Sequence, residues 1–222
     1  MMAKRLFDVA ASAAGLLVLS PLIAALALWI RLDSPGPVFY RGERAGVQNR
    51  PFRIFKFRTM VTNAEKIGGA STSAGDPRIT RSGRFIRRHK LDEIAQLLNV
   101  VRGDMSLVGP RPEVLKYTRQ YRGELTVILD VRPGITDWAS IWNSDEGAVL
   151  EGALDPDRAF EILIQPTKLQ LQLRYARERT FWTDLKIIVY TVRRLIDPGF
   201  HPAELAGIPR LEPGAGRILE SR

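Results

Sequence analysis

An uncharged apolar run of 22 residues, from Val9 to Ile30, constrains this chain more than any other feature. About 20 such residues cross the hydrocarbon core of a bilayer as a helix. A secretory signal is a poorer interpretation, because the run is long for one and Arg31 and Asp33 follow where small residues would mark a cleavage site. Three interpretations stay open: a helix that spans the bilayer, a buried core helix, and a re-entrant helix that enters and leaves by the same face.

Ser20 and Pro21 lie in the middle of this run. Proline lacks an N–H and its ring clashes with the carbonyl of Leu17, so we expect a kink. In lipid the freed carbonyl needs another partner, and the Ser20 hydroxyl can bond back to a carbonyl in the preceding turn. The sequence therefore predicts a helix break at Ser20-Pro21, which a re-entrant helix and a kinked spanning helix both accommodate.

Basic residues flank the run on both sides, and the downstream side is the more basic. The positive-inside bias therefore places the bulk of the chain on the cytoplasmic side. A re-entrant hairpin keeps both of its ends there, whereas a spanning helix would carry the short N-terminus, with Lys4 and Arg5, across the bilayer.

The net charge of +9 fits nucleic acid, anionic lipid or phosphorylated small molecules as partners, beside the plain alternative of a solubilising surface. No recognition helix, zinc finger or aromatic RNA-binding signature accompanies the basic residues, so we expect no nucleic acid. The chain has no cysteine, which excludes disulfides and thiolate nucleophiles. Its two histidines are far apart in sequence, so we expect any metal to be a hard cation bound by oxygen.

A strand is predicted between Arg50 and Met60, where the sequence reads R-P-F-R-I-F-K-F-R-T-M. Apolar and basic residues nearly alternate from Arg53 to Arg58, which is typical of a half-buried strand. Its basic face, which includes Lys56 and Arg58, either meets phosphate groups or protects a strand edge with charge.

The segment from Ser82 to Val101 has apolar residues at helical spacing and contains the acidic pair Asp92-Glu93. An aspartate at the start of a helix is usually an N-cap, and an arginine–carboxylate network without catalytic meaning is a second structural alternative. Nearby cations would keep the carboxylate ionised. An ionised aspartate beside arginines that bind phosphate oxygens could attack a phosphoryl group and form an aspartyl phosphate.

Pro110 and Pro112 flank Arg111 in the sequence G-D-M-S-L-V-G-P-R-P. Because proline fixes its own φ, the two limit where Arg111 can point and lower the cost of ordering it. A rigid arginine suits a phosphate or carboxylate ligand, and a stiff turn with a solvent-facing arginine is the alternative.

Seven motifs occur in order along the chain: K-R-L-F-D-V, S-P, P-V-F-Y-R, F-K-F-R-T-M, L-D-E-I-A-Q-L-L-N-V, G-D-M-S-L-V-G-P-R-P and V-R-P-G-I-T. This set resembles the bacterial sugar transferase family, the monotopic polyprenol-phosphate phosphoglycosyl transferases. The resemblance runs from about residue 4 to Thr136, and the region around F-W-T-D-L-K-I-I fits more loosely. Seven motifs in order are far more specific than any one of them.

The resemblance implies an α/β, mostly helical, monotopic membrane protein whose re-entrant helix turns at Ser20-Pro21. Its catalytic domain would lie on the cytoplasmic face of the bacterial inner membrane. We therefore expect residues 1–33 to form the membrane hairpin, residues 34–198 the phosphoglycosyl transferase domain, and residues 199–222 an irregular tail. This corresponds to the small form of the family, which consists of the catalytic domain alone.

Two amphipathic segments, Ala159–Arg177 and Phe181–Ile196, are predicted helices. The second carries Trp182, Tyr190 and two arginines, which would suit the lipid interface. Packing against the core of the domain is the alternative.

The resemblance also implies a reaction, the transfer of a sugar 1-phosphate from a nucleotide sugar, usually a UDP-sugar, to undecaprenyl or a related polyprenyl phosphate. UMP is the leaving group. Asp92 matches the nucleophile, which forms a covalent aspartyl phosphosugar, and Glu93 matches the second member of the dyad. Mg²⁺ assists at the diphosphate, so Asp92 and Glu93 are also the expected metal ligands.

Four basic residues match family positions as well. Arg87, five residues before the nucleophile, and Arg111 match residues that bind phosphate or nucleotide. Lys56 and Arg58 match a basic motif, which we expect to contribute to the same binding.

Many family members continue P-G-I-T with G-x-x-Q-V, whereas here Thr136 is followed by D-W-A-S-I-W-N-S-D-E, so we name no sugar. The product would enter a bacterial glycoconjugate pathway such as polysaccharide, lipopolysaccharide or exopolysaccharide biosynthesis. A homodimer is one possible assembly. The alternative function is a catalytically inactive, membrane-bound binding or scaffolding protein of the same fold. The intact Asp92-Glu93, Arg87 and Arg111 favour the enzyme.

Overall fold

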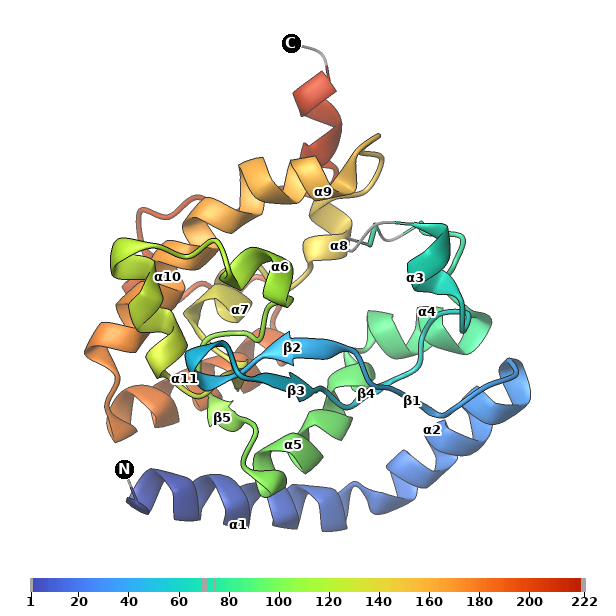
Figure 1. The fold of residues 1–222 in the computed structure, drawn as a ribbon, viewed down its shortest axis with the longest axis horizontal. Coiled ribbons are helices and arrows are strands. Elements are labelled where there is room, and N and C mark those ends of the chain that lie inside the picture. Colours follow the sequence, from blue (N-terminus) through green and yellow to red (C-terminus); the bar gives the residue numbers. More distant parts are fainter. Residues whose placement is uncertain (1, 69–71, 74, 221–222) are drawn as a thin grey trace. The chain divides into compact units, whose positions relative to one another are not determined.

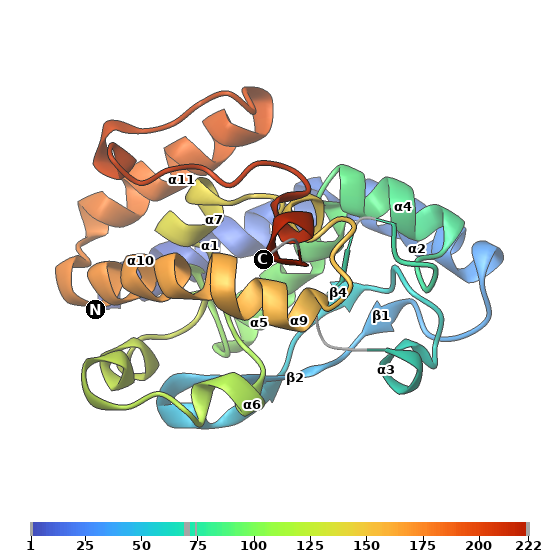
Figure 2. The same ribbon diagram turned by 90° about the horizontal axis from the view of Figure 1, so that it is seen from above.

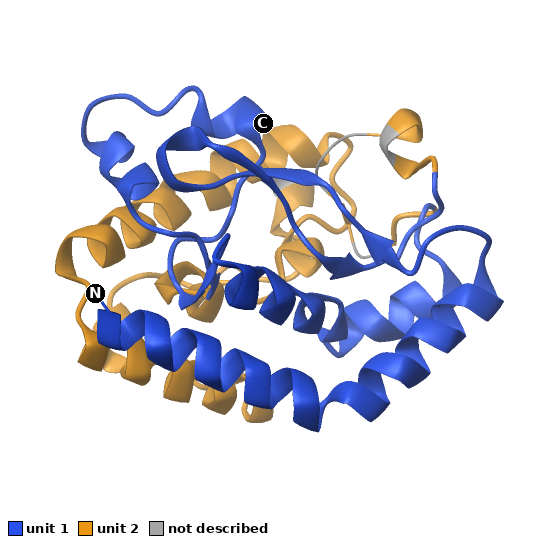
Figure 3. Ribbon diagram, turned by 60° about the horizontal axis from the view of Figure 1, so that its bottom comes forward, with its two compact units in different colours: residues 1–62, 78–135 blue, residues 63–77, 136–222 orange. Residues whose placement is uncertain are grey.

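The computed structural model describes residues 2–68, 72–73 and 75–220, and these are mostly helical with a few short strands (Figure 1). They form two compact units, coloured separately in Figure 3. Unit 1 comprises Met1–Thr62 and Arg78–Ile135, and unit 2 comprises Asn63–Pro77 and Thr136–Arg222. The boundary predicted after residue 33 rests on membrane insertion, and the one after residue 198 rests on the proline- and glycine-rich tail; both stay predictions.

The elements of unit 1 are α1 (Met2–Val18), α2 (Ser20–Asp33), β1 (Phe39–Tyr40), β2 (Glu43–Ala45), η1 (Val47–Asn49), β3 (Pro51–Arg53), β4 (Lys56–Phe57), α4 (Arg81–Arg88), η2 (Leu91–Gln96), α5 (Leu97–Arg102), β5 (Ser106–Val108), α6 (Leu115–Thr118), η3 (Gly123–Asp130) and β6 (Gly134–Thr136), whose last residue belongs to unit 2. The strands pair as three two-stranded sheets, β1 with β4, β2 with β3, and β5 with β6.

The apolar run folds as the two helices α1 and α2, which meet at a 63° bend (Figure 1). The predicted break at Ser20-Pro21 is confirmed, because α2 begins at Ser20 with Pro21 in its first turn. The Ser20 hydroxyl donates to the Leu17 carbonyl at 2.8 Å, so the carbonyl that the proline excludes from the helix ladder keeps a partner. In the described residues no single helix is long and apolar enough to cross a bilayer, whereas the bent pair taken together passes that test by length and composition.

One side of the helix pair packs on the rest of unit 1. Leu26 and Ile30 of α2 are buried in a core cluster with Phe57 and Ile86. The other side is exposed, and its apolar residues include Leu6, Leu17, Val18, Leu28 and Leu32. The interpretation as a fully buried core helix is therefore wrong, since a core helix would be covered all round.

The single strand predicted from Arg53 to Arg58 is wrong. The segment instead forms β3 and β4, which pair antiparallel with β2 and β1 respectively. The buried side chain of Asn99 replaces the sheet ladder at the break. Its Oδ1 accepts from the Phe55 N–H at 2.7 Å, and its Nδ2 donates to the Arg53 carbonyl at 3.0 Å.

Asn99→Ala should lower the free energy of unfolding by about 1–3 kcal/mol, because it leaves the Phe55 N–H and the Arg53 carbonyl without these partners. Chemical denaturation measures the change. Asn63→Ala, at an exposed site whose side chain makes no cap bond, is the control and should change stability by less than about 0.5 kcal/mol. Equal effects of the two substitutions would contradict this account of the break.

The predicted helical segment from Ser82 to Val101 is interrupted. Lys90 adopts a left-handed conformation with φ of 54° between α4 and the 3₁₀-helix η2, and α5 follows. Lys90, not Asp92, occupies the cap position of η2. The N-cap interpretation of Asp92 is therefore wrong, and Asp92 lies in the first turn, where the positive end of a helix favours a carboxylate.

Unit 2 contains α3 (Ala64–Ile67), α7 (Trp138–Trp142), α8 (Glu146–Val149), α9 (Pro156–Ala159), the π-helix η4 (Phe160–Ile164), α10 (Gln165–Glu178), α11 (Phe181–Ile196), η5 (Ala203–Leu205) and η6 (Ala215–Glu220). Figure 2 shows α9, η4 and α10 following one another as a single rod. The two predicted helices are confirmed, the first with a start at Pro156. Trp182 is 76% exposed, and the placement of α11 at a lipid interface stays a prediction.

Candidate active site

Four of the predicted site residues meet in unit 1: Lys56, Asp92, Glu93 and Arg111, here called the dyad cluster. Lys56 begins β4, and the two carboxylates lie in η2, which packs along β4. Arg111 follows β5 by three residues. Strand β4 and helix η2 are adjacent because Phe57 and Ala95 are both buried in the core cluster behind them.

Glu93 is held by two cations. Lys56 Nζ donates to its Oε1 at 2.8 Å, and Arg111 makes a two-pronged contact, with Nη1 3.1 Å from Oε2 and Nη2 on Oε1. Burial alone would raise the pKa of Glu93, but the charges and hydrogen bonds of Arg111 and Lys56 outweigh it and hold the pKa well below the usual value of 4.5. Glu93 is thus a fixed carboxylate that stays ionised at neutral pH.

Asp92 is held less tightly than its neighbour. Its Oδ2 lies 3.5 Å from Lys56 Nζ, and its side chain is 16% exposed. Lys56 therefore contacts both carboxylates, whereas the fork of Arg111 contacts Glu93. The arrangement leaves Asp92 beside a positive charge, with part of its side chain exposed.

Close backbone packing fixes the position of Arg111. The Pro110 carbonyl accepts from the Gly134 N–H at 3.0 Å, and a Cβ on Gly109 would come within 2.3 Å of the Arg132 carbonyl oxygen. Only glycine fits at position 109. The predicted rigidity of this arginine therefore comes from the contact with the strand that follows, in addition to the flanking prolines.

Arg87 contacts the residues that directly follow β4. Its Nε donates to Thr59 Oγ1 at 3.0 Å, and its Nη2 lies 3.8 Å from Met60 Sδ. Its side chain is half-buried. The structure thus places Arg87 beside Thr59 and Met60, which follow β4, and its role in binding phosphate or nucleotide stays a prediction.

Arg58 is placed apart from the dyad cluster. Its guanidinium is buried and donates to the carbonyls of Ile30, Ser34 and Pro35, so it closes the C-terminal end of α2. Burial and the nearby charge of Arg31 lower its pKa. With its donors directed at backbone carbonyls, Arg58 fits a role in holding the end of the helix pair better than a role in binding phosphate.

Sequence reasoning missed Asp8 as a residue that supports the site. It is buried in α1, and its carboxylate accepts from the Ser106 hydroxyl at 2.7 Å and from the Leu107 N–H at 3.3 Å. Asp8 thereby fixes β5, the strand that leads into Arg111. The K-R-L-F-D-V motif contains this aspartate, but a partner about a hundred residues away leaves no local signal.

The dyad cluster offers two carboxylates to a metal ion. Within residues 2–68, 72–73 and 75–220 there is no group of three or more His, Cys, Asp or Glu side chains that could hold one. Mg²⁺ is usually bound through one or two carboxylates, with waters and substrate phosphates as its other ligands. Asp92 and Glu93 therefore fit Mg²⁺ that arrives with a diphosphate, and they do not form a closed metal cage.

Comparison with known proteins gives a second, independent line of evidence on the family of this chain. The model of the family described as bacterial sugar transferase matches residues 1–198. An undecaprenyl-phosphate glucose phosphotransferase of Komagataeibacter xylinus is 42% identical over 203 residues, which cover 88% of this chain and 36% of that protein. A UDP-glucose:undecaprenyl-phosphate glucose-1-phosphate transferase of Escherichia coli K12 is 37% identical over 85% of this chain and 39% of its own length.

A protein of the same description from Caulobacter vibrioides is 37% identical over 87% of this chain and 69% of its own length. The chain therefore spans well under half of the first two relatives and about two thirds of the third.

Proposed function

Since the chain belongs to the bacterial sugar transferase family, we propose that it transfers a sugar 1-phosphate from a UDP-sugar to undecaprenyl phosphate or a related polyprenyl phosphate. UMP is released. The relatives whose descriptions name undecaprenyl phosphate support this choice of acceptor, and those that name UDP-glucose support this class of donor. The reaction is the first membrane step of a bacterial glycoconjugate pathway.

The unequal holding of the two carboxylates is the observation that carries the proposal. Lys56 and Arg111 neutralise Glu93, whereas among the residues that the structure describes Asp92 has one cation within 4.0 Å, Lys56 at 3.5 Å. A carboxylate with one long ion pair can turn onto a phosphorus atom more easily than a carboxylate that a bidentate arginine holds in place. Asp92 is therefore the nucleophile, and Glu93 positions Lys56 and Arg111 around it.

The reaction has two displacements at one phosphorus atom. An Asp92 carboxylate oxygen attacks the phosphorus that carries the sugar, the bond from that phosphorus to the bridging oxygen breaks, and UMP leaves with that oxygen. An oxygen of polyprenyl phosphate then attacks the same phosphorus and displaces Asp92 as a free carboxylate. Lys56 lowers the repulsion between Asp92 and the diphosphate, and Arg87 and Arg111 supply further positive charge near it.

Mg²⁺ fits this site as a second source of positive charge. Asp92 and Glu93 are the residues that would hold it, together with oxygens of the diphosphate. When bound, it neutralises charge on the diphosphate and on the departing UMP.

The helix pair α1–α2 supplies the membrane attachment. The 63° bend and the exposed apolar side support a re-entrant hairpin in the inner membrane, with unit 1 on the cytoplasmic face. A re-entrant pair returns to the face it entered by, and the satisfied Leu17 carbonyl makes the bend tolerable in lipid. This attachment would hold the dyad cluster near the level of the lipid phosphate.

Pro21→Ala should restore a helical N–H and straighten the pair, so that the N-terminus shifts toward the periplasm. The chain has no cysteine, so Met2→Cys provides a single thiol for labelling with a membrane-impermeant maleimide. Periplasmic labelling should rise in Pro21→Ala and stay at background in Pro198→Ala, which changes an exposed proline after α11. Labelling that stays cytoplasmic in both would show that the proline is not the decisive bend.

Release of UMP tests the activity directly. The purified chain is incubated with a panel of UDP-sugars, Mg²⁺ and undecaprenyl phosphate, and UMP should form with at least one donor. Omission of the lipid should limit UMP to at most one equivalent per enzyme, because the aspartyl phosphosugar cannot turn over. Silence across the panel would favour the alternative, a catalytically inactive binding or scaffolding protein.

A further inference from the structure

We propose that Arg41 and Arg102, which gather on the ring of Phe55, bind the phosphate of an anionic phospholipid headgroup. The three residues come from separate places in unit 1. Arg41 follows β1, Phe55 precedes β4, and Arg102 is the last residue of α5. The inference rests on the proposed attachment of the helix pair to a bilayer.

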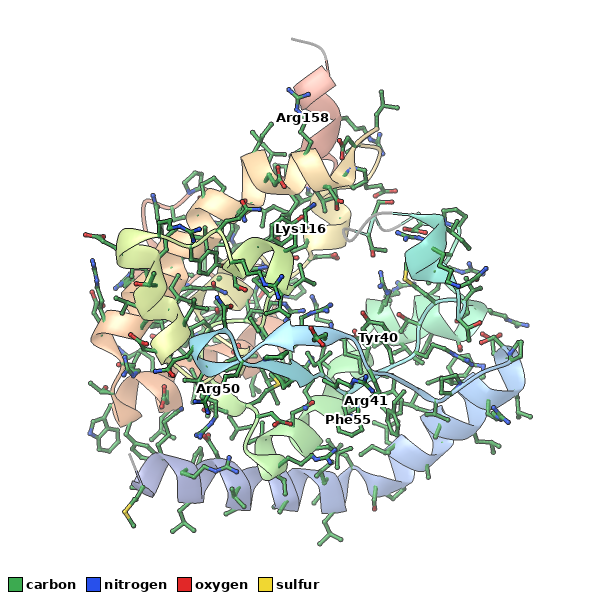
Figure 4. The ribbon with its side chains drawn as sticks, viewed as in Figure 1. Tyr40, Arg41, Arg50, Phe55, Lys116 and Arg158 are labelled. Atoms are coloured by element: carbon green, nitrogen blue, oxygen red, sulfur yellow. The ribbon has the colours of Figure 1, made fainter. Side chains whose placement is uncertain are left out.

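Both guanidinium groups approach the same aromatic ring. The guanidinium carbon of Arg41 lies 3.7 Å from the centroid of Phe55, and that of Arg102 lies 5.5 Å from it. Figure 4 shows Arg41 and Phe55 close together beside the strands. A guanidinium stacked on a ring keeps its N–H donors in its own plane, where they remain available to a phosphate oxygen.

The ring is a fixed platform. The Phe55 N–H donates to Asn99 Oδ1 at 2.7 Å, and the Phe39 ring packs edge-on against Phe55 with centroids 5.8 Å apart. An arginine that rests on an ordered ring loses less freedom when it binds a ligand than an arginine that moves freely in water. Phe55 therefore lowers the cost of ordering both guanidinium groups.

The two positive charges lack a counterion. In the part of the chain that the structure describes, neither Arg41 nor Arg102 has a carboxylate within 4.0 Å, and both residues are exposed. The carboxylate of Asp104, two residues after Arg102, accepts instead from Asn99 Nδ2 at 3.1 Å. Like charges around one ring repel, and a bound anion would replace that repulsion with attraction.

The place of Arg102 at the end of α5, next to α1, indicates a lipid rather than a soluble phosphate. Helix α5 packs against α1. Arg5 of α1 donates to the carbonyls of Val100 and Val101 at 2.7 and 3.1 Å, so the C-terminal end of α5 contacts α1 directly. Leu6, one residue after Arg5, is 73% exposed. Long basic side chains beside such an apolar surface reach the headgroup level, and the cytoplasmic leaflet is anionic.

Vesicle flotation tests the site with the full chain. Wild type is compared on phosphatidylcholine vesicles and on vesicles of equal parts phosphatidylcholine and phosphatidylglycerol. The test variant is Arg41→Gln with Arg102→Gln. The control is Arg50→Gln with Arg158→Gln, which removes the same charge from two exposed arginines elsewhere (Figure 4).

Wild type should prefer the mixed vesicles, and the test variant should lose about tenfold or more of that preference, since each basic residue at an anionic surface contributes about a fivefold factor. Binding to phosphatidylcholine alone should stay the same. The control should change the preference by less than about twofold. Turnover in detergent without phospholipid should be unaffected in both variants.

Several results would overturn the inference: an equal loss in both double variants, no loss in the test variant, or competition by inorganic phosphate as effective as that by phosphatidylglycerol. Equal binding of wild type to both kinds of vesicle would overturn this inference and leave the membrane attachment intact. Failure of wild type to bind either kind would overturn the attachment as well.

Discussion

Asp92→Asn should abolish turnover, with a loss of at least about four orders of magnitude in the rate of UMP release. The amide lacks the ionised oxygen that attacks phosphorus, so no aspartyl phosphosugar can form. Asn is nearly isosteric with Asp, and the ion pair that Asp92 makes with Lys56 is long, at 3.5 Å, so the fold should persist. Circular dichroism checks the fold, and release of UMP measures the rate.

The covalent step has its own readout in mass spectrometry. Wild type incubated with a UDP-sugar and Mg²⁺, without lipid, should gain the mass of one sugar phosphate on the peptide that contains Asp92. The Asp92→Asn protein should gain nothing, and Asp130→Asn, at an exposed carboxylate, should behave like wild type. An adduct on another residue would move the nucleophile there, and normal turnover of Asp92→Asn would end the assignment.

Arg111→Ala should lower turnover by about 10²–10³-fold, the range seen when one preorganised electrostatic contact is removed from an active site. The substitution takes away the fork on Glu93 and leaves Lys56 as the cation that contacts it. Lys56 would then be drawn toward Glu93 and away from Asp92. Arg119→Ala, eight residues on and exposed, is the control and should keep activity within about twofold.

Arg111→Ala should also change how turnover and stability depend on pH. In wild type the folded pKa of Glu93 lies below its ordinary value of 4.5, so its ion pairs stabilise the fold fully above that pH and this stability is lost as the pH falls below it. Without Arg111, burial is opposed by Lys56 alone, so the pKa of Glu93 rises. The acid limb of the pH–rate profile should move to higher pH, and the stability difference from wild type should shrink as pH falls from 7 toward 3.

An unshifted acid limb in Arg111→Ala would mean that Glu93 does not control the rate through its ionisation. A loss of turnover in Arg119→Ala equal to that in Arg111→Ala would mean that general positive charge matters, not the fork on Glu93. Either result would remove Glu93 from the positioning role proposed above.

Elements with local causes could be predicted from the sequence. The bend at Ser20-Pro21 is one, because the proline excludes the Leu17 carbonyl from the ladder and the neighbouring serine rebinds it within one turn. The helix α11 is another, since its apolar period is visible in sixteen consecutive residues. Motif order also identified the family, because seven short patterns together are specific even where each alone is weak.

The break between β3 and β4 could not be predicted in this way. The alternation from Arg53 to Arg58 favoured one continuous strand, and the residue that interrupts it, Asn99, is 46 positions from Arg53. A side chain that replaces a strand-to-strand hydrogen bond from such a distance leaves the alternation of apolar and basic residues unchanged. The same reason applies to Asp8, whose partner Ser106 is 98 positions away.

Lys56 and Arg58 show which part of the site the sequence determines and which part depends on the tertiary structure. Both are basic, both belong to the motif F-K-F-R-T-M, and the sequence assigned them to one phosphate-binding face. In the fold, Lys56 contacts Asp92 and Glu93, whereas Arg58 closes the end of α2. The sequence determined that the charges and the dyad are present. Packing of β4 between η2 and α2 decided that Lys56 meets the two carboxylates and that Arg58 meets the carbonyls at the end of α2, because those partners come from segments 23 to 37 residues away.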